Sequence, residues 1–220
     1  MVIMLTILVI RVTDPSDPPR KTRKEILSEW RHKEILEAAR RIFASLGYAG
    51  TNVEEIAKEA GMAKGTVYLY FKSKEEVFAA VLASDWECLT HKTIEGMSAA
   101  KTFEERLTVF LNLRLAYLQH NQDFLRIYIA EFDGCGSRSA LISQVIDKLF
   151  WRGIDFMRQC LEQAIAVGEL RAVPVEPAAM AIYDLSRGFV LRHLRGWAHL
   201  TLEEDLAFTH SLIMNGLREK

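Results

Sequence analysis

The sequence predicts an all-α protein in which three short helices precede six longer ones. Three observations predict this fold. Apolar residues recur at three- and four-residue spacing after residue 23, strand-like alternation of β-branched residues is absent, and glycine and proline gather at a few points. We expect helices at residues 24–46, 52–60, 63–70, 74–98, 102–119, 122–133, 138–168, 176–198 and 203–218.

Start signals support several of these helices. Ser73 precedes an acidic first turn, so we expect it to cap the fourth helix. Thr102 with Glu105 three residues later has the pattern of a capping box, and Thr201 opens the last helix in the same way.

The first helix carries one apolar stripe that we interpret as core. The stripe consists of Ile35, Leu36, Ala39, Ile42, Phe43 and Leu46. We expect it to pack against apolar residues of the next two helices, namely Ile56, Ala57, Val67 and Phe71.

Residues 51–78, TNVEEIAKEAGMAKGTVYLYFKSKEEVF, indicate two short helices joined by a tight turn, with a third helix directly after them. Thr51 stands where a hydroxyl can cap the first of them. Gly61 follows Ala60, where a helix end favours a left-handed residue. A helix–turn–helix places its second helix in the DNA major groove, and here that helix offers Lys64 for phosphate and Gly65 for close backbone approach.

This segment and the helix before it resemble the DNA-binding domain of the tetracycline-repressor (TetR) family of bacterial transcription regulators. The matching residues are Ile35, Ala38, Ala39, Phe43, Gly47, Tyr48, Thr51, Ile56, Ala57, Ala60, Gly61, the run 64–71, Lys74 and Phe78. The resemblance implies a DNA-binding domain at residues 23–75 and a ligand-sensing and dimerisation domain at 76–220. The division falls in the fourth helix, which belongs partly to both domains.

The resemblance also implies a set of DNA contacts. Lys64, Gly65 and Thr66 would lie nearest the bases, while Tyr68, Tyr70 and Lys74 would touch the backbone, and Thr51 would both cap its helix and donate to a phosphate. The full predicted DNA-binding set is Thr51, Lys64, Gly65, Thr66, Tyr68, Leu69, Tyr70 and Lys74. The alternative for the two tyrosines is aromatic packing at the surface. Arg20, Lys21, Arg23 and Lys24 either add contacts from a flexible arm or only aid solubility.

The distribution of charge agrees with a DNA-binding N-terminal part. The formal net charge is −1, but residues 20–74 carry a net charge of +5 and residues 75–220 a net charge of −5. A basic module joined to an acidic body suits a protein in which only the module touches DNA, although scattered surface charge is the simpler alternative.

The middle helices are rich in large apolar and aromatic residues, which line small-molecule pockets. The predicted ligand-binding residues are Trp86, Phe110, Arg114, Tyr117, Tyr128 and Trp151. Arg114 lies at helical spacing with Phe110 and other apolar residues, so it must be paired or reach outward. Its partner is either a ligand carboxylate or an internal acid, with Glu131, Asp155 and Asp184 as candidates. The effector is expected to be largely apolar.

A single helix–turn–helix reads few base pairs, so a homodimer on an inverted-repeat operator is expected. We assign the dimer surface to apolar residues of the last two helices, although such a stripe is also typical of intramolecular core. These residues are Met180, Tyr183, Leu185, Phe189, Val190, Leu194, Leu206, Phe208, Leu212, Ile213 and Leu217.

Residues 1–22 are interpreted as an N-terminal extension. Residues 1–10 are nearly all apolar, which is too short for a membrane-spanning helix, and residues 11–20 read as a disordered linker. An appendage, a translation start placed too early, and a membrane tether remain open. Cys88, Cys135 and Cys160 have no metal-ligand spacing, which favours a reduced, cytoplasmic protein; Cys135 is either a redox sensor or an incidental thiol.

The function predicted from the sequence is that of a repressor that a small molecule releases from its palindromic operator. The six histidines show no metal-binding spacing, and no phosphate-binding glycine loop or nucleophile motif is present, so neither an enzyme nor a cofactor is predicted. The alternative is a helical adaptor that has lost DNA binding, because Leu69 and Ala63 replace residues that are often polar in the family.

Overall fold

The computed structural model describes residues 22–132 and 140–218, and within these ranges all regular elements are α-helices. They are α1 (Arg23–Gly50), α2 (Val53–Glu59), α3 (Lys64–Tyr68), α4 (Lys74–Ala99), α5 (Phe103–His120), α6 (Gln122–Phe132), α7 (Ala140–Ala166), α8 (Val175–Leu194) and α9 (Leu202–Leu217). The all-α prediction is confirmed. No helix in the described ranges is both long and apolar enough to cross a membrane. The predictions for Arg20, Lys21, Cys135 and the first 21 residues lie outside the described part of the chain.

The start signals predicted at Ser73, Thr102 and Thr201 are confirmed. The Ser73 hydroxyl accepts a hydrogen bond from the Glu76 amide, and Thr102 and Thr201 each form a complete capping box. α8 ends earlier than predicted, at Leu194, because Gly196 adopts a left-handed φ of 69°. The amide of Trp197 then donates to the carbonyl of Arg192 at 2.8 Å, which closes the helix end.

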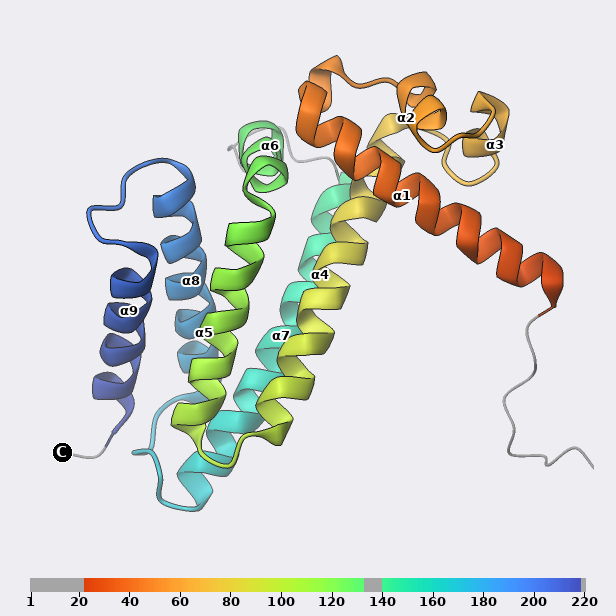
Figure 1. Ribbon diagram of the computed structural model, residues 1–220. Coiled ribbons are helices and arrows are strands. Elements are labelled where there is room, and N and C mark those ends of the chain that lie inside the picture. The colour runs from red at the N-terminus through yellow and green to blue at the C-terminus, as the bar shows by residue number, and fades with distance from the viewer. Residues whose placement is uncertain (1–21, 133–139, 219–220) are drawn as a thin grey trace, which may run out of the picture.

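Figure 1 shows α2 and α3 at one end of the molecule, beside α1, with the remaining helices forming an elongated body. α4 runs from beneath α1 down the body, where it lies beside α5 and α7. α8 and α9 form the opposite side of the body. α1 contacts both α4 and α6, so the end that carries α2 and α3 is joined to the body at two places.

The first hydrophobic core joins α1, α2 and α3 to the start of α4. Phe43 of α1 packs edge-on against Phe78 of α4, with ring centroids 4.9 Å apart, and Phe78 packs against Phe124 of α6. Ile35, Ala39 and Phe43 of the predicted stripe of α1 are buried here, and Leu36 and Ile42 are partly buried against the same core. Leu46 is the exception: it is 47% exposed, and helical geometry breaks at the next residue, Gly47.

Arg40 makes a polar connection between α1 and the body. Its guanidinium forms an ion pair with Asp85 of α4 and donates to the Asn121 side chain at 2.5 Å. The same guanidinium lies over the ring of Phe124, 5.3 Å from the centroid. The Asp85 side chain is only 12% exposed, so water screens this ion pair weakly. A single α1 side chain thus binds α4, the α5–α6 turn and α6.

Replacing Arg40 by alanine should lower the free energy of unfolding by about 2 kcal/mol, because the loss leaves the Asp85 carboxylate partly buried without its cation. Arg41→Ala is the matched control, since Arg41 is exposed and pairs only with Glu59 of α2. Its effect should stay within about 0.5 kcal/mol. Urea denaturation of both variants measures the difference, and equal losses would show that the contact between α1 and the body contributes little.

Candidate DNA-binding surface and ligand cavity

α3 presents its side chains to opposite sides of the short helix. Val67 is fully buried in the first core, whereas Tyr68 is 47% exposed and Leu69 is 82% exposed. Gly61 sets this orientation: its φ of 64° ends α2, and the Met62 amide donates back to the Ala57 carbonyl at 2.9 Å. The predicted helix–turn–helix geometry is therefore present, with α3 anchored at one residue and open to solvent on the other side.

The first turn of α3 is exposed and positively charged. Lys64 is exposed, and its ammonium forms an ion pair with Glu54 of α2 at 3.1 Å. The hydrogen bond that the Lys64 ammonium donates to the Glu54 carboxylate raises the pKa of Lys64 above its usual value. Gly65 is exposed too, and a methyl group added there would meet no atom within 4 Å. Nothing inside the described protein therefore requires glycine at position 65.

Thr51 lies inside the domain. It is only 2% exposed, and its hydroxyl donates to the Gly47 carbonyl at 2.7 Å. The prediction that Thr51 caps the following helix is wrong: Asn52 is the cap, and its side chain accepts from the amides of Glu54 and Glu55. A hydroxyl has a single proton to donate, so a phosphate contact by Thr51 would compete with the internal bond.

Lys74 and Tyr70 lie at the edge of the surface. The Lys74 ammonium donates to the Tyr48 carbonyl at 2.7 Å and lies 4.4 Å from the centroid of the Tyr48 ring. Tyr70 follows α3, is half-buried and packs against the first core, with its ring near His32. Thr66 is half-buried as well. The most exposed members of the predicted DNA-binding set are therefore Lys64, Gly65, Tyr68 and Leu69.

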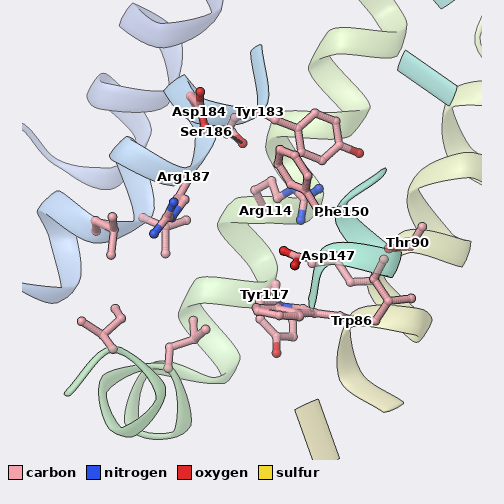
Figure 2. A pocket seen from close by; sticks show the side chains of 16 residues that line it. Trp86, Thr90, Arg114, Tyr117, Asp147, Phe150, Tyr183, Asp184, Ser186 and Arg187 are labelled. Atoms are coloured by element: carbon pink, nitrogen blue, oxygen red, sulfur yellow. Dashed lines mark hydrogen bonds between the residues drawn. The ribbon is translucent and has the colours of Figure 1, made fainter. Parts of the chain in front are cut away.

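A cavity of about 300 Å³ lies in the body between α4, α5, α6, α7 and α8. Its apolar lining consists of Trp86, Leu89, Leu125, Ile129, Leu149, Phe150, Val190 and Leu191. Its polar lining consists of Thr90, Arg114, Tyr117, Asp147, Tyr183, Asp184, Ser186 and Arg187. Figure 2 shows Arg114 in the middle of this group, with Tyr183 on one side and Asp147 and Tyr117 on the other. Pockets for small molecules likewise combine apolar walls with polar groups that fix the orientation of the ligand.

Three of the six predicted ligand-binding residues line the cavity: Trp86, Arg114 and Tyr117. Phe110 is fully buried behind the lining, where it contacts Arg114 and Tyr183. The prediction for Trp151 needs correction, because Trp151 is 49% exposed and does not line the cavity, while its neighbour Phe150 does. The side chain of Tyr128 is outside the described part of the chain.

Arg114 lies between two aromatic rings. Its guanidinium carbon is 4.8 Å from the centroid of Phe110 and 5.1 Å from that of Tyr183. Burial raises the pKa of Tyr183, although the nearby Arg114 charge acts against it, and burial raises the pKa of Tyr117 to about 12. Both phenols are therefore neutral at physiological pH. Gly153 of α7 permits this packing, since a methyl group there would collide with the Tyr183 phenol oxygen.

The internal partners predicted for Arg114 are not found among the described side chains. Asp155 forms its ion pair with Arg158 at 2.7 Å, and Asp184 is exposed and forms no ion pair with Arg114 within the described ranges. The Glu131 side chain is outside the described part. The Arg114 Nε atom is buried and has no hydrogen-bond acceptor in that part. Arg114 was predicted from the sequence as unusual, whereas Tyr183, whose ring packs against its guanidinium, was assigned to the dimer surface and not to the cavity.

The apolar stripe of the last two helices divides between interior and surface. Phe189, Ile213 and Leu217 are buried in the cores, whereas Phe208 and Leu212 of α9 are 57% and 49% exposed. A partly buried charge cluster connects the two helices. Asp205 of α9 accepts two hydrogen bonds from the Arg192 guanidinium, at 2.8 and 3.0 Å, and lies 3.0 Å from His193. The outer face of α9 thus keeps two large apolar side chains in solvent.

An exposed second helix in a helix–turn–helix, attached to a helical body with an interior cavity, defines a class of DNA-binding regulators. Residues 35–81 match the model of the bacterial regulatory proteins of the tetR family. The chain is 30% identical over 189 residues to the "Probable HTH-type transcriptional regulator ArpR" of Pseudomonas putida, covering 80% of this chain and 84% of that protein. The chain belongs to the tetR family and is a DNA-binding transcriptional regulator. The family consists of regulators and not of enzymes.

Other similar proteins extend the comparison to most of the body. The fatty acid metabolism regulator protein of Bacillus subtilis is 24% identical over 141 residues, covering 64% of this chain and 71% of that protein. The structure of FadR from Bacillus subtilis in complex with stearoyl-CoA has a TM-score of 0.72 at 23% identity, covering 84% of this chain and 98% of that one. A TetR/AcrR-family regulator from Thermobifida fusca has a TM-score of 0.67 at 22% identity, covering 86% and 99%. Both structures share the fold described above.

Replacing Thr51 by valine should lower the free energy of unfolding by about 1–2 kcal/mol, since the Gly47 carbonyl loses its donor in a buried site. Thr51→Ser is the control, because it keeps the hydroxyl. We expect the DNA affinity of the folded valine variant to equal that of the wild type, as measured by fluorescence anisotropy well below the melting temperature. A loss of affinity in a fully folded Thr51→Val protein would instead restore Thr51 to the DNA-binding set.

Proposed function

We propose that this protein is a homodimeric repressor that a small molecule releases from an inverted-repeat operator. Residues 23–75 bind DNA, residues 76–220 bind the effector and the second subunit, and the protein acts in the cytoplasm. The observation that carries the proposal is the exposure of α3 on a regulator whose body contains a mostly apolar cavity.

The exposed side of α3 has the chemistry of a groove-reading helix. Lys64 supplies positive charge, and the hydroxyls of Thr66 and Tyr68 suit phosphate oxygens or base edges. Glycine in a helix costs up to about 1 kcal/mol relative to alanine, and no internal contact explains it at Gly65. Close approach of the α3 backbone to DNA is a sufficient reason for this glycine.

Dimerisation through α8 and α9 would place two recognition helices on one operator. Phe208 and Leu212 are the large apolar residues of α9 that remain available for such a contact. Two-fold symmetric regulators read half-sites about 34–36 Å apart, one turn of DNA. The separation of the two α3 helices therefore decides DNA affinity, and any movement that changes it weakens binding.

The cavity is the proposed effector site. The relative named a fatty acid metabolism regulator and the similar structure in complex with stearoyl-CoA support a small-molecule effector in the body. Tyr117 connects the cavity to the DNA-binding end. Its phenol donates weakly to Asp85 at 3.4 Å, and Asp85 is the ion-pair partner of Arg40 in α1. The Asn121 side chain, which binds Arg40, also donates to the Tyr117 carbonyl at 2.9 Å.

The direct test of this function is selection of bound sequences from a random duplex library with the full-length protein. We expect two inverted half-sites, together with a steep fall in affinity as the salt concentration rises, because phosphate contacts release counterions. A lone asymmetric motif would contradict the dimer. Absence of any retention on DNA at low ionic strength would contradict the regulator and favour a protein-binding adaptor.

Gly65→Ala should have opposite effects on stability and on DNA binding. The free energy of unfolding should rise by up to about 1 kcal/mol, because alanine is the better helix former and its methyl group meets no protein atom. Affinity for the selected operator should fall about tenfold, or about 1.4 kcal/mol. Unchanged DNA affinity in Gly65→Ala would remove Gly65 from the DNA interface.

A further inference from the structure

We infer that the effector of this protein is an amphipathic organic anion whose headgroup binds Arg114. This inference rests on the proposed function, since it specifies the chemical class of the molecule that the cavity takes. It depends on three features of the cavity: the state of the guanidinium, the position of the acids, and the nature of the remaining wall.

The Arg114 guanidinium is a cation that the described protein leaves without an anionic partner. Its Nε is buried and has no acceptor, and no ion pair of Arg114 is found in the described ranges. A buried donor without an acceptor lowers stability, so native proteins rarely keep one without a reason. An anionic group bound in the cavity would supply both the missing charge and the missing acceptors.

The two rings beside Arg114 prepare it for such a group. Phe110 and Tyr183 contact the guanidinium at 4.8 and 5.1 Å from their centroids, which limits its orientation before any ligand arrives. The Tyr183 hydroxyl accepts one side-chain hydrogen bond from Arg114, whereas the buried Nε has no acceptor in the described ranges, so that edge of the planar fork remains available to a carboxylate. Figure 2 shows this side chain directed into the space that the other lining residues surround.

Two acids also line the cavity and would favour a cationic ligand. Their influence on the charge of the ligand is weaker than that of Arg114. Asp147 and Asp184 are both exposed, so water screens their charge. Arg114, by contrast, is half-buried. An ion pair formed away from water is stronger than one formed at the surface, so a ligand gains more from pairing with Arg114.

The wall around Arg114 fits the apolar part of such an anion. Trp86, Leu125, Phe150 and Val190 enclose the space from four different helices. The cavity volume of about 300 Å³ is at the lower end for ligand pockets. It suits a ligand whose apolar part is of moderate size and which carries a single headgroup. The chemical class is therefore an apolar chain or ring system with one carboxylate or comparable anionic group.

The test uses three probes that share a ten-carbon chain and differ in the headgroup: decanoate, 1-decanol and decyltrimethylammonium. Isothermal titration of the full-length, DNA-free protein should give tightest binding for decanoate, about tenfold or more tighter than for decanol, because only the anion pairs with Arg114. Arg114→Met should weaken decanoate binding about 10- to 100-fold and leave decanol binding unchanged. Arg114→Lys keeps the charge but loses the planar fork, and it should lie between the two.

Arg152→Met is the matched control, because Arg152 is an exposed α7 residue that pairs with Glu87 at 3.9 Å. Circular dichroism checks that each variant is folded. If Arg114→Met does not fold, Arg114→Lys takes its place in the comparison. Tighter binding of the ammonium probe, equal binding of the three probes, or no binding of any would overturn the inference. Unchanged decanoate binding in a folded Arg114→Met protein would also overturn the inference.

Failure of the proposed function is distinguishable from failure of this inference. The same probes are added to the protein bound to its selected operator, and DNA release is followed by fluorescence anisotropy. Binding of decanoate through Arg114 without release of DNA supports the anion site and contradicts the repressor mechanism. Operator binding by a protein that takes none of the probes contradicts the anion site and leaves the DNA-binding function intact.

Discussion

α4 contributes buried residues to the DNA-binding end and to the body, and the other features of the structure depend on this shared helix. Val77, Phe78 and Leu82 belong to the first core, whereas Met97 belongs to the core of the body. Between them, Trp86 and Thr90 line the cavity. A close-packed helix moves as a unit, so a shift at the cavity reaches the start of α4, which follows α3 after a short loop.

A second set of contacts, made by Arg40, restricts the movement of α4 relative to the DNA-binding end. Arg40 holds α1 to Asp85 on the same helix and to Asn121 at the α5–α6 turn, so the DNA-binding end contacts the body on both sides of Phe124. Packed interfaces of this kind have discrete arrangements and resist continuous deformation. Two alternative packing arrangements of α1 against α4 and α6 would therefore give two different distances between the α3 helices of a dimer.

Periodicity and end signals predicted the fold because both are local properties of the chain. The predicted caps at Ser73, Thr102 and Thr201 are present, since each needs only its own first turn. The site was predicted less well because neighbours distant in sequence decide it. The hydroxyl of Thr51 turns inward to Gly47, which leaves Asn52 as the cap, and the rotation of α7 turns Phe150 inward and Trp151 outward. No local pattern distinguishes these adjacent pairs.

Reciprocity limits how the cavity and the DNA surface can influence each other. A ligand shifts an equilibrium only by its difference in affinity for the two states, and DNA must weaken ligand binding by the same factor. Tyr117 is where that difference can arise, since its ring faces the cavity while its phenol contacts Asp85, the partner of Arg40. Under the proposed mechanism, a headgroup bound to Arg114 would compete for the space beside this ring. The ligand would then favour a state in which the ion pair between Asp85 and Arg40 is weaker, which would link the charge in the cavity to the position of α1.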